Sequence, residues 1–177
     1  MILIILTLIL CIIIFAITLY NQKFNFISTK LKNITERINS SLIKRKKLLE
    51  DSEQIIKSEL NTKKAIYENL KDLNKEKLDM IKLDRKLLVY IKEFYLIKDK
   101  YKKLQHNNDF EKITFSICDN EEKLNAYKQY YNDTILEYNK IIKIFPFSIL
   151  SIIKGRKEKE FFDKESINDT DYNDFKY

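Results

Sequence analysis

The sequence predicts an all-α protein, with an N-terminal transmembrane helix followed by an antiparallel bundle of three long helices and a short C-terminal helix. Two observations support this fold class. Residues 2–20 contain no charged residue, glycine or proline, so a helix here can cross a bilayer with its backbone groups bonded internally. The 177 residues include one glycine and one proline, which favours long uninterrupted helices over sheets with many turns.

The apolar run is expected to remain as a membrane anchor over residues 1–22. It spans about 28 Å as a helix, whereas a signal-peptide core is usually about 7–15 residues long and follows a basic start. This run has no such start, and Ala16 has no small partner at the spacing of a cleavage site. Basic residues from Lys23 to Arg37 follow the run, so the positive-inside bias predicts an outside amino terminus and a cytoplasmic body in the cell membrane.

The first helix of the body is predicted from Lys23 to about Leu60, continuous with the anchor because no helix breaker separates the two. Its apolar residues recur at helical spacing and are Ile27, Leu31, Ile34, Ile38, Leu42, Leu49, Ile56 and Leu60. Arg45 lies on this stripe. We interpret it as a snorkelling side chain with its charged head in water, with ligand binding as the alternative.

A second helix is predicted from about Thr62 to Leu104, with Lys77 and Asp84 interrupting its apolar stripe. Residues 105–109 are turn formers, so the chain should reverse there. Asp109 is the expected N-cap of the third helix. His106 is the only histidine, and the default interpretation is a solvated loop imidazole.

The third helix is predicted from its stripe between Ile113 and Phe145. Asn120 interrupts this stripe and is expected to be a hydrogen-bonded core amide. Two Tyr-Asn pairs, Tyr131-Asn132 and Tyr138-Asn139, lie seven residues apart and therefore share a helix face. The buried phenols need hydrogen-bond partners, which the asparagines or an adjacent helix could provide.

Pro146 should end the third helix and begin a short one that Gly155 closes. Its four aliphatic residues, Ile149, Leu150, Ile152 and Ile153, are dense for a surface element. Our preferred interpretation is that they cap the open end of the bundle; the alternative is that they lie on the membrane beside a basic flank. Residues 163–177 are acidic and poor in apolar content, which predicts a disordered tail.

The formal net charge of +7 comes from basic residues interleaved with Asp and Glu, which is typical of a solvated surface and gives no reason to expect nucleic acid. Cys11 lies in the anchor and Cys118 in the body, so no disulfide is expected. The chain offers no metal-ligand spacing, no phosphate-cradling loop, and no histidine other than His106 to assist a nucleophile. We expect no enzyme activity, catalytic residue, metal, cofactor or small-molecule substrate.

Four short motifs occur in the second half of the chain: Tyr131-Asn132, Tyr138-Asn139, Phe145-Pro146 and Phe161-Phe162. Their order and spacing resemble the LemA family of bacterial membrane-anchored helical proteins. The first half is similar too, with Tyr20-Asn21 ending the anchor and a Leu-basic-Arg-x-x-Leu run between Leu42 and Leu49. Three residues depart from the family pattern: Glu50-Asp51 replaces the usual Pro-Asn, and Lys123 replaces an arginine.

The resemblance implies a LemA-like bundle over residues 23–162, an extracellular amino terminus, and a family without an established catalytic activity. We therefore expect a non-enzymatic, membrane-tethered helical scaffold with the eight motif residues in structural roles. Its partners would be the lipid bilayer and a membrane or cytoplasmic protein. The alternative function is a membrane-surface module that organises anionic lipid.

Overall fold

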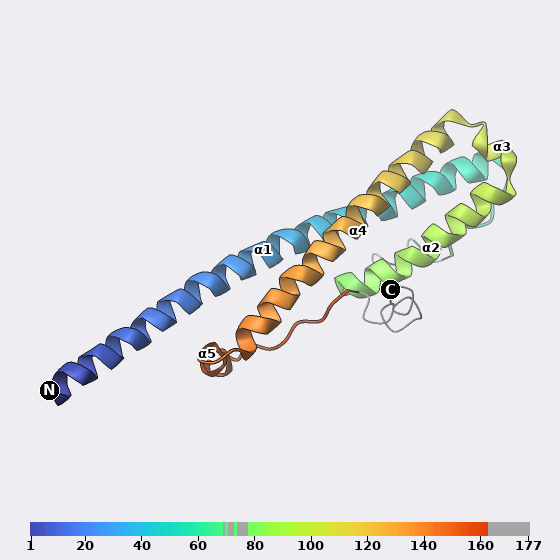
Figure 1. The fold of residues 1–177 in the computed structure, drawn as a ribbon. Coiled ribbons are helices and arrows are strands. Elements are labelled where there is room, and N and C mark those ends of the chain that lie inside the picture. The colour runs from blue at the N-terminus through green and yellow to red at the C-terminus, as the bar shows by residue number, and fades with distance from the viewer. Residues whose placement is uncertain (69, 71–72, 74–77, 163–177) are drawn as a thin grey trace, which may run out of the picture. The chain divides into compact units, whose positions relative to one another are not determined.

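The computed structural model describes residues 1–68, 70, 73 and 78–162. Their regular structure is all helical, in agreement with the predicted fold class. Figure 1 follows the helices in chain order, and their bounds are α1 Ile2–Glu59, α2 Met80–Lys100, α3 Lys102–Gln105, α4 Asn108–Lys143 and α5 Phe147–Ile153. The predicted disordered tail, residues 163–177, lies outside the described residues.

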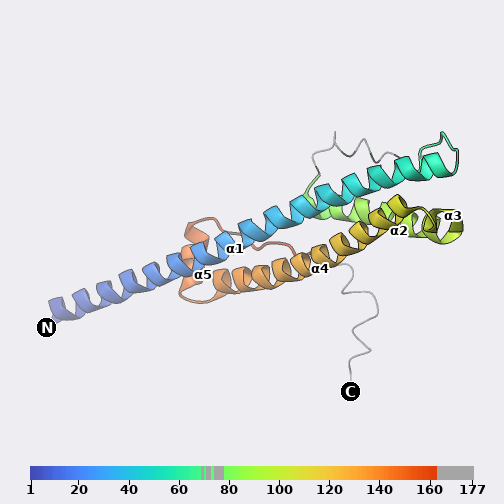
Figure 2. The ribbon, with the colours of Figure 1, turned by 90° about the horizontal axis from the view of Figure 1, so that it is seen from above.

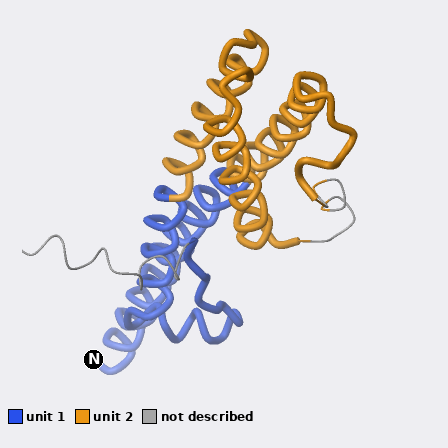
Figure 3. Tube along the Cα trace, turned by 90° about the vertical axis from the view of Figure 1, so that its right-hand side faces the viewer, with its two compact units in different colours: residues 1–35, 129–177 blue, residues 36–128 orange. Residues whose placement is uncertain are grey.

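The chain divides into two compact units (Figure 3). Unit 1 comprises residues 1–35 and 129–177, and unit 2 comprises residues 36–128. Helices α1 and α4 contribute residues to both units, whereas α2 and α3 belong to unit 2 and α5 to unit 1. The predicted domain boundaries after residues 22 and 162 differ from this division and stay predictions.

Helix α1 confirms the predicted continuity between the anchor and the first helix of the body, because it runs without a break from Ile2 to Glu59. The predicted stripe is buried along this helix at Ile27, Leu31, Ile34, Ile38, Leu42, Leu49 and Ile56. Spacings of three and four keep these side chains on one face, so the periodicity identified the face that packs inward.

The start of α1 is long and apolar enough to cross a membrane. Its most apolar window of 18 residues has a mean hydropathy of 3.4, and no residue of that window is buried. A single membrane span fits these properties, and a signal sequence near an amino terminus shares them.

The end of α1 corrects the prediction for the second helix. Asn61 adopts a left-handed conformation with φ 50°. The N–H of Asn61 bonds to the carbonyl of Ser58, and that of Thr62 bonds to the carbonyl of Lys57. This pair of bonds is a Schellman motif, in which asparagine takes the position that glycine usually occupies.

The predicted helix from Thr62 is therefore wrong over the described residues before α2, which begins at Met80. Tyr67, Leu70 and Leu73 are nevertheless buried. Tyr67 and Leu70 lie in a bend and a turn, and the Ile66 N–H donates to a Glu53 carboxylate oxygen at 3.0 Å. The apolar spacing thus indicated burial correctly and helix incorrectly.

The reversal between α2 and α4 occurs close to its predicted place, with α3 between them (Figure 1). The cap differs by two residues. Asn107 Oδ1 accepts the N–H groups of Asp109 (3.0 Å) and Phe110 (2.9 Å), whereas Asp109, the predicted cap, lies in the first turn. His106 is exposed in this loop, as expected.

Candidate functional site

Helix α5 packs on α1 through one face, which is made by Phe147, Leu150 and Ser151. The Phe147 ring stacks on Tyr20 with centroids 5.1 Å apart, and the hydroxyls of Tyr20 and Ser151 share a hydrogen bond. Figure 2 shows α5 next to α1. Because Tyr20 ends the apolar run, this contact places α5 at the end of the stretch that can cross a membrane.

The opposite face of α5 is exposed and corrects the expectation that the bundle covers this segment. Ile149, Ile152 and Ile153 are 51%, 78% and 74% exposed. They occur at i, i+3 and i+4, so they share a face, and the packed residues Phe147, Leu150 and Ser151 share the other. A single-layer contact of a seven-residue helix can bury only one face, which leaves three isoleucines facing outward.

A basic segment follows α5. Gly155 ends the helix with φ 61°, and the N–H groups of Gly155 and Arg156 bond to the carbonyls of Ile152 and Ser151, confirming the predicted glycine cap. The Lys154 ammonium donates to Asn21 Oδ1 at 2.7 Å. The Arg156 guanidinium lies over the Phe24 ring, 3.1 Å from its centroid.

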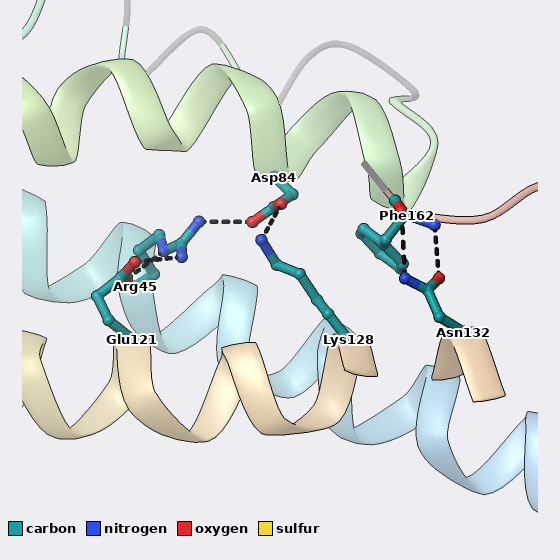
Figure 4. Close-up of polar contacts among 6 residues, drawn as sticks. All are labelled: Arg45, Asp84, Glu121, Lys128, Asn132 and Phe162. Atoms are coloured by element: carbon teal, nitrogen blue, oxygen red, sulfur yellow. Dashed lines mark hydrogen bonds and ion pairs between the residues drawn. The ribbon is translucent and has the colours of Figure 1, made fainter. Parts of the chain in front are cut away.

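The asparagines of the two Tyr-Asn motifs hold the chain beyond this segment. Asn139 accepts the N–H of Lys159 (2.9 Å) and donates to its carbonyl (3.0 Å). Asn132 does the same with Phe162, at 2.8 and 3.2 Å (Figure 4). Each side-chain amide therefore pairs with a backbone residue as a neighbouring strand would.

The seven-residue spacing of the motif follows from this contact. Seven residues of helix advance about 10.5 Å, and three residues of extended chain, from 159 to 162, advance about 10 Å. Asparagines two turns apart on α4 are therefore in register with residues three apart on an extended segment. The segment runs antiparallel to α4, since the later asparagine binds the earlier residue.

The backbone contacts of Asn132 and Asn139 are here called the asparagine clamps, and the motif tyrosines lie next to them. Tyr131 packs edge-on against the buried Phe162, with ring centroids 5.1 Å apart, and Tyr138 lies 5.5 Å from Phe24. Burial raises the pKa of Tyr138, and the nearby charge of Arg156 partly offsets that rise. The remaining motif residues are Phe145 and Pro146, which are exposed, and Phe161, which is half-buried.

Unit 2 contains a buried ion cluster that sequence reasoning missed. Arg45 is only 1% exposed, so its predicted position with the head in water is wrong. Its Nε and Nη2 donate to the two carboxylate oxygens of Glu121 at 2.6 Å, and its Nη1 donates to Asp84 at 2.6 Å (Figure 4). The ammonium of Lys128 lies 2.6 Å from the other Asp84 oxygen.

This ion cluster, Arg45, Asp84, Glu121 and Lys128, joins α1, α2 and α4 within unit 2. Its two positive and two negative charges balance, and a buried guanidinium needs this bidentate and fully paired geometry to offset its desolvation. The signal in the sequence was that Arg45 and Asp84 both interrupt apolar stripes. Asn120, predicted as a bonded core amide, is confirmed by its bond to the Ser41 carbonyl at 3.2 Å.

An open groove of about 460 Å³ lies between α2 and α4 of unit 2. Its lining includes Tyr95, Phe110, Phe115 and Cys118. Phe115 is 76% exposed, which is high for a large aromatic ring. Within the described residues, no three His, Cys, Asp or Glu side chains are grouped so that they could hold a metal ion.

Comparison with known proteins supports the resemblance drawn from the motifs. A model of the LemA family matches residues 27–173, which is most of the chain. Comparison with curated proteins finds no significant match. The family match includes both asparagine clamps and all four members of the ion cluster. The chain therefore belongs to the LemA family.

Proposed function

We propose that this chain is a non-enzymatic, membrane-tethered helical scaffold that presents unit 2 to a membrane or cytoplasmic protein. The observation that carries the proposal is the groove between α2 and α4, where Phe115 stands exposed beside Tyr95 and Cys118. Exposed aromatic rings beside a concave surface are typical of protein contacts. The four charged side chains of the ion cluster bind one another and hold the helices of unit 2 together.

In this proposal α1 remains as a single span, with the amino terminus outside and the body in the cytoplasm, and the helices of the body form an antiparallel bundle. The basic residues that follow the apolar run support this orientation. Cys118 is exposed, so its labelling reports on which side of the membrane the body lies. An impermeant thiol reagent should label Cys118 only after cells are permeabilised; labelling in intact cells contradicts the orientation.

Site-specific photocrosslinking in native membranes tests the scaffold function. A photoreactive residue at position 115 of the full chain should form a discrete adduct with another protein. The matched control is position 47, because Lys47 is exposed on α1 in the same unit. Equal adducts at both positions, or none at position 115, contradict partner binding at the groove.

A second candidate function is a membrane-surface module, and the exposed face of α5 favours it. Three outward isoleucines lie at the end of the apolar run, and each gains roughly 1.5–3 kcal/mol when it is fully removed from water. The basic residues after α5 add about 1 kcal/mol each near an anionic surface. Both contributions favour the membrane as the cover of this face.

Spin labels in nanodiscs test this second function. In the full chain with Cys11→Ala and Cys118→Ser, a label at position 152 should be relaxed by oxygen and shielded from a water-soluble nickel chelate. A label at position 157, where Lys157 is exposed, should show the reverse. Equal exposure of both labels to the nickel chelate contradicts a membrane-surface role.

A further inference from the structure

Arg156 has a buried donor with no partner. Among the described residues, its Nη1 is the one buried side-chain nitrogen or oxygen without a hydrogen-bond partner. The Phe24 ring covers the face of the guanidinium, with its centroid 3.1 Å from the Arg156 Cζ atom, and the Tyr20 ring centroid lies 5.0 Å from that atom. A guanidinium carries five N–H donors at its edge, so a ring against its face leaves those donors for an acceptor.

The charges around Arg156 favour an anionic acceptor. Lys154, two residues before Arg156, donates to Asn21 on α1, and Lys157 is exposed in the same segment. The neighbouring carboxylate of Glu158 is paired with Lys143 at 2.9 Å. The segment after α5 therefore presents three cationic side chains, and the nearby carboxylate of Glu158 is already paired with Lys143.

The depth of Arg156 relative to the apolar run identifies the source of that anion. Phe24 lies four residues after Tyr20 on α1, which is about 6 Å further along the helix axis. The headgroup layer on each side of a bilayer is about 5–8 Å thick, the difference between the apolar core and the full width. If α1 spans the membrane, the guanidinium on Phe24 lies in the layer that contains lipid phosphates.

We propose that Arg156, together with Lys154 and Lys157, binds the phosphate of an anionic phospholipid headgroup. The planar guanidinium suits bidentate binding of phosphate oxygens. The isoleucine face of α5 would contact the acyl chains of the same leaflet. This inference rests on the proposed membrane-surface function and on a retained span, and it adds a defined site and a lipid class.

Native mass spectrometry of the full chain, released from detergent micelles, tests the site. Phosphatidylglycerol should remain bound in preference to phosphatidylcholine, and Arg156→Gln should weaken its binding on the order of tenfold. Lys102→Gln is the matched control, because it removes one exposed charge from unit 2. Arg156→Lys keeps the charge without the planar fork and should fall between the wild type and Arg156→Gln.

Three outcomes overturn the site: unchanged binding in Arg156→Gln, an equal loss in Lys102→Gln, or equal retention of the two lipids. Displacement of phosphatidylglycerol by millimolar inorganic phosphate also overturns it, since the ligand would then be the free ion. The melting temperature of Arg156→Gln in lipid-free detergent must match that of the wild type. If it does not, Lys157→Gln takes its place in the binding experiment. Unchanged phosphatidylglycerol binding in Lys157→Gln then overturns the site.

The proposed function fails separately from the site. An intact mass that lacks the residues before Lys23 contradicts the retained span. A spin label at position 152 that is open to water contradicts the membrane-surface helix, whereas the Arg156 variant reports only on the headgroup site.

Discussion

In unit 2 the four charged side chains of the ion cluster bind one another, whereas in unit 1 the motif asparagines bind the backbone. The Arg45 guanidinium binds both carboxylate oxygens of Glu121 and one of Asp84, so the cluster joins specific residues of specific helices. Asn132 and Asn139 bind peptide groups, which every residue except proline offers. Side-chain pairing therefore fixes partners in unit 2, and backbone pairing fixes register in unit 1.

The largest expected effect comes from breaking the ion cluster. Arg45→Met removes the guanidinium and leaves Asp84 and Glu121 with only Lys128, so we expect a loss of about 3–5 kcal/mol in the free energy of unfolding. Denaturation of the full chain in detergent, followed by circular dichroism, measures the loss. Lys47→Met, at an exposed position of the same helix, is the control and should change little.

The cluster also predicts a rescue. Adding Glu121→Gln to Arg45→Met removes one of the two carboxylates and leaves Asp84 paired with Lys128, so part of the lost stability should return. If the double variant is less stable than Arg45→Met, the four charges do not act as one neutral group. The contrast between side-chain pairing in unit 2 and backbone pairing in unit 1 is then lost.

A smaller effect is expected from the clamp in unit 1. Asn139→Ala removes both bonds to Lys159, whose backbone groups can then bond to water, so the loss should be about 1–2 kcal/mol. Hydrogen exchange of the Lys159 amide should accelerate. Asn139→Asp keeps the acceptor for that amide and should protect it partly, while Asn125→Ala, at an exposed position of α4, should leave its exchange unchanged.

Tyr67 in unit 2 should make the free energy of unfolding depend on pH. Burial raises the pKa of Tyr67, although its hydrogen bond with the Ser52 hydroxyl opposes the rise. The phenol of the unfolded chain ionises near pH 10, about its ordinary pKa. The folded state keeps its proton, so stability is intact below pH 10 and falls by about 1.4 kcal/mol per pH unit above it, until the folded pKa is reached.

Tyr67→Phe removes this dependence. The unfolding free energies of the wild type and the variant, measured in detergent between pH 9 and pH 11, should therefore diverge by about 1.4 kcal/mol at pH 11. Parallel curves contradict the raised pKa. Tyr138→Phe in unit 1 should diverge less, because burial raises the pKa of Tyr138 but the charge of Arg156 offsets part of that rise.

The smallest effect is expected at the surface of unit 2. A bond from Lys123 lowers the pKa of Asp119, so any contribution is present at neutral pH and lost as pH falls through the acid range. The Lys123 side chain is 57% exposed and that of Asp119 is 35% exposed, so solvent screens the pair. Lys123→Gln should leave unfolding unchanged within error, and a measurable loss removes the distinction between surface and core ion pairs.

The sequence predicted those features of the fold that depend on neighbouring residues. The stripe from Ile27 to Ile56 and the cap at Gly155 are local patterns, and both were identified correctly. The end of α1 is also local, but asparagine is less common than glycine in the left-handed position. Asn61 therefore went unnoticed, and the second helix was predicted from Thr62, whereas α2 begins at Met80.

Long-range features were harder to predict. Arg45 pairs with residues 39 and 76 positions away, and a single sequence does not show which charges meet. For α5, the composition showed that its isoleucines need cover. It did not show that Ser151 would fix the helix to Tyr20 by one face, which turned the other face outward.

The hydrogen bond between Tyr20 and Ser151 joins residues 131 positions apart. Unit 2 is continuous in sequence, whereas unit 1 is made from residues on both sides of it. As the chain leaves the ribosome, every residue of unit 2 therefore emerges before any residue of α5. The contacts of α5 with α1 can form only near the end of synthesis, so the surface next to the apolar run is completed last.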